Sequence, residues 1–245
     1  MDKDLSEMAR GSYGYGRWEA PYWFIGPEQG MGDHEREDSE SALEARVAAW
    51  IKLGRLDLND CRKFHCEIGE KNWHCKEPVK LQKTWTPLLL TMMKFLDRPE
   101  DNESLRAYQR DQWGMLDEET CVIELSGLAA PKLKKAKANP FLPERIEAIC
   151  QRMLTHRPEL VVMYGRMQWK SWNAIAKAVT GRGFPDDTEH DLPKTSFLVH
   201  GRTILCRTPH PSRPIRVGTQ YLVNEYWTRL GRKLRDLRNH PCHST

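Results

Sequence analysis

Two short segments near opposite ends of the chain combine residue types that can stabilise charge in a reaction. Residues 26–30 read Gly-Pro-Glu-Gln-Gly, so Glu28 presents a carboxylate between glycines that let backbone approach a ligand closely. Residues 208–214 read Thr-Pro-His-Pro-Ser-Arg-Pro, where prolines stiffen a loop that carries the His210 imidazole. Rigidly held acidic and imidazole groups are typical of a preorganised catalytic or binding site.

Each segment directly follows a short apolar run that has the length of a buried strand. We expect four strands, at residues 22–25, 121–125, 160–164 and 203–206. Apolar spacing and capping residues predict helices at residues 41–53, 87–96, 103–113, 143–155, 167–179 and 219–237. This alternation predicts an α/β domain with a central four-stranded parallel sheet flanked by helices. Ligands of such sheets bind beyond the C-terminal ends of the strands, where both segments lie.

Length and composition predict one globular domain. The chain has 245 residues, of which 39% are hydrophobic, enough for a single α/β core. We expect a flexible lead-in over residues 1–20, the domain over residues 21–238 and a tail over residues 239–245. No run is long and apolar enough to cross a membrane, and the seven cysteines lack the spacing of a disulfide scaffold. These features favour a monomeric, cytoplasmic protein without a membrane partner.

The charge distribution suggests a polyanionic partner. The net charge is only +4, but basic residues gather at residues 132–137, with Lys132, Lys134 and Lys135, and again at residues 229–238. Acidic runs lie in the first half of the chain, so one side of the protein is expected to be basic. Each cluster taken alone fits a solvated loop or helix face equally well.

The two segments, in this order and after these strands, resemble the motifs of the uracil-DNA glycosylase superfamily, and the resemblance extends from about Tyr22 to Trp227. It implies a DNA glycosylase that flips a base out of DNA and hydrolyses its N-glycosidic bond without a cofactor. Glu28 and His210 are then the catalytic residues. The implied base pocket consists of Gly26, Pro27, Gln29, Gly30 and Ser126.

The resemblance implies a role for each of these groups. Glu28 would stabilise the oxocarbenium-like sugar and orient water, whereas a neutral His210 would donate to the base carbonyl oxygen as negative charge develops. Ser212 would hold a phosphate beside the flipped nucleotide. Arg213 stands where relatives place an apolar wedge, so we expect it to contact phosphate or a base edge instead.

Two departures from the uracil-specific branch bear on the substrate. That branch has a tyrosine, which blocks groups on pyrimidine C5, where this chain has Gly30, and an asparagine near the position of Ser126. We therefore expect a glycosylase for a C5-modified cytosine, such as glucosylated hydroxymethylcytosine in phage DNA, with a role in antiviral defence. The alternatives are a uracil repair glycosylase, a DNA-binding member without activity and an unrelated nucleotide hydrolase.

The sequence leaves two further features undecided: the aromatic residue that stacks on the base and the role of a cluster of cysteines and histidines. The aromatic residue that stacks on the base could be Phe64, Trp73 or Trp85, and each could equally be core. Cysteines and histidines cluster within residues 61–75, as Cys61, Cys66, His74 and Cys75. Because no Cys-x-x-Cys pair is present, reduced free thiols are favoured over a structural zinc site, and no metal is expected.

Overall fold

The computed structural model describes residues 3–30, 39–130, 140–186, 192–213, 215–217, 220–221 and 223–240. Within these ranges, the side chains of residues 28–30, 39, 129–130, 166, 216–217, 220–221 and 223 are not described. The helices are α1 (Lys3–Gly11), α2 (Ser39–Lys52), α3 (Cys61–Glu67), α4 (Trp85–Phe95), α5 (Asn102–Asp111), α6 (Leu142–His156), α7 (Trp169–Thr180) and α8 (Val223–Asn239), with short 3₁₀ turns η2 (Lys71–Trp73) and η4 (Arg166–Gln168).

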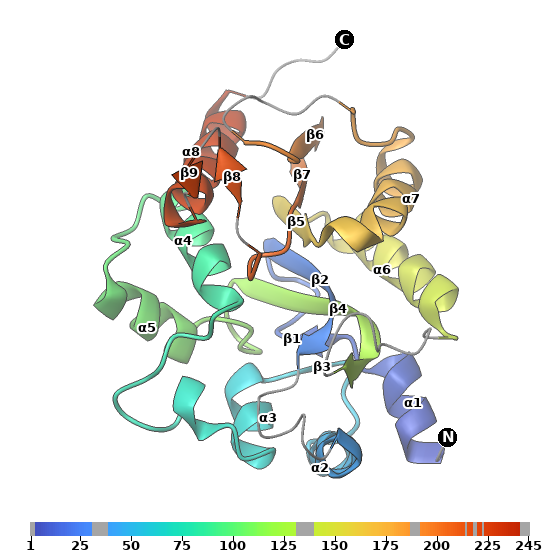
Figure 1. The fold of residues 1–245 in the computed structure, drawn as a ribbon. Coiled ribbons are helices and arrows are strands. Elements are labelled where there is room, and N and C mark those ends of the chain that lie inside the picture. Colours follow the sequence, from blue (N-terminus) through green and yellow to red (C-terminus); the bar gives the residue numbers. More distant parts are fainter. Residues whose placement is uncertain are drawn as a thin grey trace.

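The centre of the fold is one mostly parallel sheet (Figure 1). Its strands run in the order β3-β1-β4-β2-β5-β7-β6, from β1 (Gly14–Tyr15), β2 (Tyr22–Gly30), β3 (Leu58–Asn59), β4 (Thr120–Ala130), β5 (Leu160–Tyr164), β6 (Ser196–His200) and β7 (Thr203–Thr208). The neighbouring pairs β4-β2, β2-β5 and β5-β7 are parallel. A separate hairpin joins β8 (Arg216–Val217) to β9 (Gln220–Tyr221).

The predicted α/β class is confirmed, but the predicted four-stranded sheet is not, because the described residues form a seven-stranded one. The four predicted strands are its adjacent central strands β4, β2, β5 and β7. The strands that the sequence did not reveal are β1 and β3, with two residues each, and β6, which pairs antiparallel with β7. Two residues are too short to show a period, so no sequence pattern marked β1 or β3.

The N-terminal segment belongs to the fold instead of forming a flexible lead-in. Helix α1 packs against β4 and α2, and β1 lies between β3 and β4 in the sheet. The backbone at Gly14 explains part of this arrangement, since a Cβ there would come within 2.1 Å of the Val122 carbonyl oxygen. Only glycine allows β1 to approach β4 so closely.

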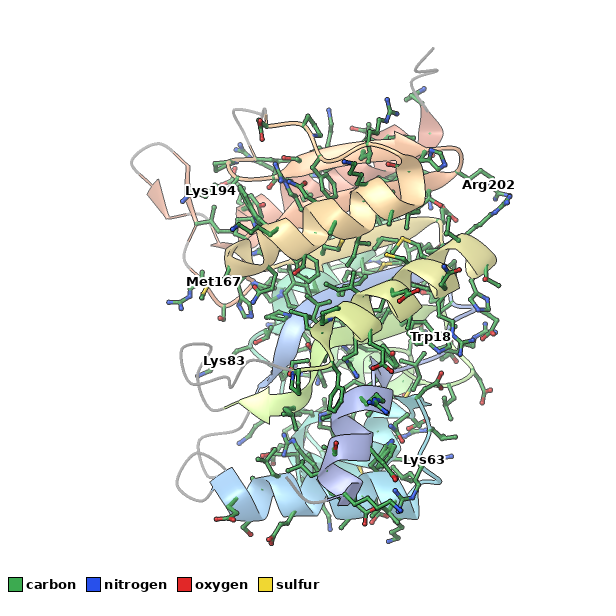
Figure 2. The ribbon with its side chains drawn as sticks, turned by 90° about the vertical axis from the view of Figure 1, so that its right-hand side faces the viewer. Trp18, Lys63, Lys83, Met167, Lys194 and Arg202 are labelled. Carbon is green, nitrogen blue, oxygen red and sulfur yellow. A yellow bond between two sulfur atoms is a disulfide. The ribbon has the colours of Figure 1, made fainter. Side chains whose placement is uncertain are left out.

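Helices cover both faces of the sheet, as expected for buried parallel strands. Phe24, Val122 and Val162 point to the face covered by α2, α3, α4, α5 and α8, where the larger core cluster lies. The alternate residues Trp23, Ile25 and Val161 point to the opposite face. Helices α6 and α7 cover that face (Figure 2). No helix in the described part of the chain is long and apolar enough to span a bilayer.

Candidate functional site

The C-terminal half of β2 and the end of β7 meet around Gly165, which directly follows β5. The Gly165 amide donates to the Thr208 carbonyl oxygen at 3.0 Å, and a Cβ on Gly165 would lie 3.7 Å from Pro27 Cδ. The Trp172 indole from α7 donates to the Gly165 carbonyl oxygen at 3.0 Å and so ties the turn to the core. With a φ of +107°, this close turn requires glycine. The two segments from opposite ends of the chain therefore share one edge of the sheet.

His210 is partly buried at this edge and has a defined tautomer. The Ser212 backbone amide donates to His210 Nδ1 at 3.2 Å, and the Ser212 hydroxyl lies 2.8 Å from the same nitrogen. Because a backbone amide can only donate, Nδ1 accepts, and the proton of the neutral ring resides on Nε2. Burial, followed by the nearby Arg213 charge, lowers the His210 pKa from 6.5 to about 4. His210 is therefore a neutral Nε2–H donor at neutral pH.

Tyr164 and Glu124 converge above Gly26, on the face of the sheet that α3 and α4 cover. A Cβ on Gly26 would lie 2.3 Å from the Tyr164 hydroxyl oxygen and 2.8 Å from Glu124 Oε2. The Tyr164 ring also meets the His210 ring edge-on, with centroids 5.7 Å apart. A carboxylate, a phenol and an imidazole thus follow one another across β4, β2, β5 and the loop after β7. Gly26 makes room for this row because it has no side chain.

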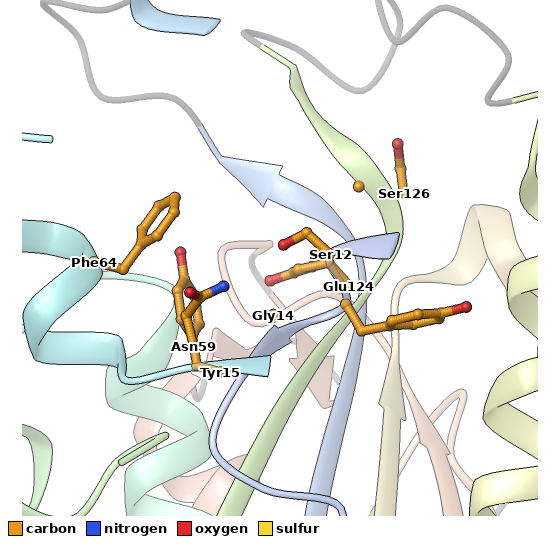
Figure 3. A pocket seen from close by; sticks show the side chains of 9 residues that line it. Ser12, Gly14, Tyr15, Asn59, Phe64, Glu124 and Ser126 are labelled. Carbon is orange, nitrogen blue, oxygen red and sulfur yellow. The ribbon is translucent and has the colours of Figure 1, made fainter. Parts of the chain in front are cut away.

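A pocket opens beside this row, between β1, β3, β4 and α3 (Figure 3). The cavity itself is small, about 20 Å³, and the rest of its space opens to solvent. Phe64, Asn59, Glu124 and Ser126 supply one aromatic ring, one amide, one carboxylate and one hydroxyl; the remaining lining residues are Ser12, Tyr13, Gly14, Tyr15 and Gly127. Aromatic surface with a few polar groups is typical of a small-molecule or base site. Of the three aromatic candidates from the sequence, Phe64 is the one that lines this pocket.

Arg145 from α6 holds the pocket end of β4 in place. Its fully buried guanidinium donates to the Glu124 carbonyl oxygen at 2.7 Å and to that of Leu125 at 2.8 Å. It also donates to carbonyls in α1 at Ala9 and Arg10, and stacks on the Tyr13 ring at 4.2 Å. Desolvation lowers the Arg145 pKa to about 10, which still leaves it charged at neutral pH. The backbone that carries Glu124 and Ser126 is thereby fixed.

The structure places the backbone, but not the side chain, of the proposed acid Glu28. Residue 28 lies in β2 opposite Ser126, and Gly30 lies opposite Ala130 with a register shift between them. The side chain of Gln29 is likewise outside the described part of the structure. Gly26 and Pro27 are buried at the same edge, and Ser126 lines the pocket while its hydroxyl donates to the Leu128 carbonyl oxygen at 3.2 Å.

The proposed DNA-contacting residues are described only in part. Ser212 and Arg213 are exposed beside His210, and the Ser212 hydroxyl is engaged with His210 Nδ1. Lys132, Lys134 and Lys135 lie outside the described residues. Their predicted contacts with the DNA backbone stay predictions.

Sequence reasoning missed Glu124, Tyr164 and Asn59 as site residues. A signal existed for Glu124, because it is the one charged residue in the apolar run Cys-Val-Ile-Glu-Leu of residues 121–125. A charge inside a buried strand needs a polar environment, which at the end of a parallel strand is the ligand site. No comparable signal marked Tyr164 or Asn59.

The cysteine-rich segment forms a cluster behind Phe64. The structure pairs Cys66 with Cys75 in a disulfide, whereas free thiols were expected. Cys61, His65 and His74 are buried together, and each offers a metal-ligating atom within 4.8 Å of the other two. Burial raises the pKa of the Cys61 thiol and lowers the pKa values of His65 and His74, the latter to about 4, so all three are neutral when no metal is bound.

No protein-family model matches the chain, and no curated protein matches it in sequence. Functional inference therefore depends on the geometry of the site. That geometry combines a neutral imidazole donor, a buried carboxylate and an aromatic pocket wall at the C-terminal edge of a parallel sheet. Such a set can bind a planar polar ring and stabilise negative charge that develops on it.

Proposed function

We propose that the protein is a DNA glycosylase of the uracil-DNA glycosylase type, which hydrolyses the N-glycosidic bond of a flipped-out pyrimidine. The observation that carries the proposal is that Pro27, which precedes Glu28 in β2, and Thr208, two residues before His210, both contact the Gly165 turn, while Glu124 at the same edge lines the Phe64 pocket. This brings the two motifs to the same edge, as a shared catalytic site requires.

His210 supplies the electrostatic part of the mechanism. As the bond between sugar and base breaks, the base takes the electron pair and its carbonyl oxygen gains negative charge. The Nε2–H group of a neutral imidazole can donate to that oxygen without giving up its proton. The Ser212 contacts to Nδ1 support this role because they favour the required tautomer.

Glu28 supplies the carboxylate for the sugar. Its negative charge would stabilise positive charge at C1′ and orient a water, whose oxygen bonds to C1′ while its proton passes to the carboxylate or to solvent. The departing base anion is then protonated from water, which leaves an abasic site. The backbone position of residue 28, two residues beyond Gly26 in β2, supports this assignment.

The pocket favours a cytosine-type base over uracil. The Glu124 carboxylate can accept hydrogen bonds from the exocyclic amine of cytosine. The corresponding group of uracil is a carbonyl oxygen, which an ionised carboxylate would repel. Ser126 and Asn59 line the same pocket and could complete the hydrogen bonds to the ring, while Phe64 offers an aromatic surface for stacking.

Gly30 extends the proposal to bases that carry a C5 substituent. A glycine where uracil-specific relatives have tyrosine leaves that volume to the substrate. A glucosylated hydroxymethylcytosine in phage DNA, and hence antiviral defence, fits such a site. Exposed Arg213 and the lysines at positions 132, 134 and 135 would contact the DNA backbone.

The test is excision from duplexes that contain uracil, cytosine, hydroxymethylcytosine or its glucosylated form, with alkaline cleavage at abasic sites. Glu28→Gln and His210→Asn should each lower cleavage by about 100-fold or more. The matched controls Glu147→Gln on α6 and His200→Asn at the end of β6 remove exposed groups and should keep full activity.

Two outcomes would refute parts of the proposal. Excision of uracil alone would replace the modified-cytosine assignment with a repair glycosylase. DNA binding with no excision of any of these bases would favour a non-catalytic DNA-binding protein. Glu124→Gln tests base choice separately, because an amide can donate to a carbonyl, so the ratio of uracil to cytosine-type excision should rise.

A further inference from the structure

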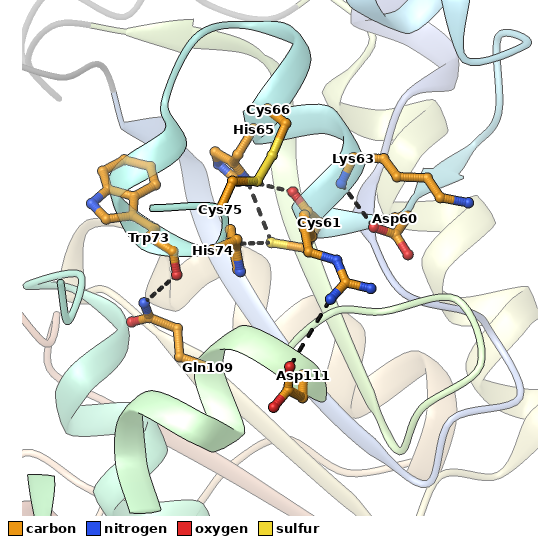
Figure 4. Close-up of a disulfide and its surroundings, with 11 residues drawn as sticks. Asp60, Cys61, Lys63, His65, Cys66, Trp73, His74, Cys75, Gln109 and Asp111 are labelled. Atoms are coloured by element: carbon orange, nitrogen blue, oxygen red, sulfur yellow. Dashed lines mark hydrogen bonds and ion pairs between the residues drawn. A yellow bond between two sulfur atoms is a disulfide. The ribbon is translucent and has the colours of Figure 1, made fainter. Parts of the chain in front are cut away.

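We infer that Cys61, His65 and His74 form a buried zinc site through Cys61 Sγ, His74 Nε2 and one ring nitrogen of His65. The three residues come from the start of α3, its last turn and the residue after η2 (Figure 4). Their side chains are nearly inaccessible, with residue exposures of 0%, 2% and 4%. Three ligands of the two types that zinc prefers, one cysteine and two histidines, thus meet in one buried place.

The distances match those of a tetrahedral zinc site. Cys61 Sγ lies 3.5 Å from His74 Nε2, and one ligating atom of each of the three residues lies within 4.8 Å of the other two. With a Zn–S bond of about 2.3 Å and a Zn–N bond of about 2.0 Å, tetrahedral angles place sulfur and nitrogen about 3.5 Å apart. The distance between Cys61 Sγ and His74 Nε2 therefore already matches the geometry of the loaded site.

Hydrogen bonding leaves one nitrogen of this cluster without a well-placed partner. The Cys61 thiol can donate to His74 Nε2, which lies 3.5 Å from its sulfur. His65 Nδ1 also lies 2.7 Å from the Cys61 carbonyl oxygen, a distance at which it donates to that oxygen. His74 Nδ1 is buried and makes no hydrogen bond of good geometry.

The surrounding residues suit a structural metal. The His65 ring contacts the rings of Tyr15, Phe64, Trp73 and Trp85, which exclude water from it. Structural zinc usually has four protein ligands. Reduction of the adjacent Cys66–Cys75 disulfide by a phosphine, which supplies two electrons and becomes the phosphine oxide while water supplies the two protons and the oxygen, frees two thiols, of which one would be the fourth ligand.

The proposed zinc would hold one wall of the pocket. Phe64 precedes His65 in α3 and lines the pocket, so a metal that joins α3 to η2 restrains the Phe64 ring. This role is independent of the glycosylase proposal, because it concerns the stability of the wall and not the reaction.

The test uses the full chain purified without chelator in a phosphine reductant and needs no DNA. Elemental analysis should find about one zinc per chain. Cys61→Ser and His74→Gln should each reduce it to about a tenth or less. Cys150→Ser, which changes a buried cysteine on α6 outside the cluster, should retain it.

A second measurement on the wild type covers the case in which the variants do not fold. Exchange with Co²⁺ should produce visible d–d bands of tetrahedral cobalt and a near-ultraviolet sulfur-to-cobalt band. Wild-type protein that binds neither zinc nor Co²⁺ in the reductant would overturn the inference, as would full zinc content in folded Cys61→Ser. Zinc content would stand even if no glycosylase activity were found.

Discussion

Replacing His210 by asparagine should change stability in a pH-dependent way, because burial keeps the native imidazole neutral. The folded-state pKa is about 4, against 6.5 for the unfolded chain. Between these values the unfolded chain binds the proton more readily, so unfolding is favoured as the pH falls. The contribution of neutral His210 is complete above about pH 6.5 and is progressively lost towards about pH 4.

The magnitude follows from the two pKa values. At about pH 5 protonation of His210 in the unfolded chain lowers the free energy of unfolding by roughly 2 kcal/mol, whereas at about pH 7.5 this loss is close to zero. The loop is partly exposed, and solvent screening reduces the expected effect to about 1 kcal/mol. Asparagine does not titrate, so the stability advantage of wild type over His210→Asn should be about 1 kcal/mol smaller at the lower pH.

The assay is urea unfolding of both proteins at the two pH values, in which all other titrating groups cancel. His200→Asn removes an exposed imidazole at the end of β6 and serves as the matched control. An identical difference between wild type and His210→Asn at both pH values would refute the reasoning. His210 would then not be held neutral by burial, and its proposed role as a neutral donor would lose its support.

Three further predictions follow from the site and its supports. Arg145→Leu should lower the free energy of unfolding by about 3 kcal/mol or more in urea titrations, because it leaves four backbone carbonyls without their donor; a loss below about 1 kcal/mol would contradict this. Gly30→Tyr should abolish excision of a glucosylated base in the duplex assay while sparing any excision of uracil, and equal activity on both would exclude an open C5 side. Replacing Lys132 and Lys134 by alanine should reduce the slope of log binding constant against log salt by about one per lost phosphate contact, whereas an unchanged slope would mean that these lysines are solvated.

The central strands could be predicted because each is a continuous apolar run. Parallel strands such as β5 are buried on both faces, which leaves a strong local signal. Strands β1 and β3 have two residues each and depend on pairing with distant partners, so their sequences contain no comparable pattern.

The candidate site likewise contains some residues that local sequence could predict and others that only the fold brings together. Glu28 and His210 stand in segments of distinctive composition and could be proposed from it, although the predicted loop at residues 26–30 is the end of strand β2. Glu124 and Tyr164 become site residues only because parallel pairing places β4 and β5 on either side of β2, with Gly26 between them. That juxtaposition depends on strand order and register, which are properties of the whole sheet.

The sequence by itself determined the α/β class, the central strands and the two distinctive segments that hold the proposed catalytic groups, because these are encoded in local periodicity and composition. Tertiary structure decided the rest. Cys61, His65 and His74 cluster because α3 and η2 pack against each other. The tautomer of His210 depends on a chain turn that brings the Ser212 amide to within hydrogen-bond distance of Nδ1. Distances between side chains on separate elements are set by packing, and a one-dimensional pattern does not contain them.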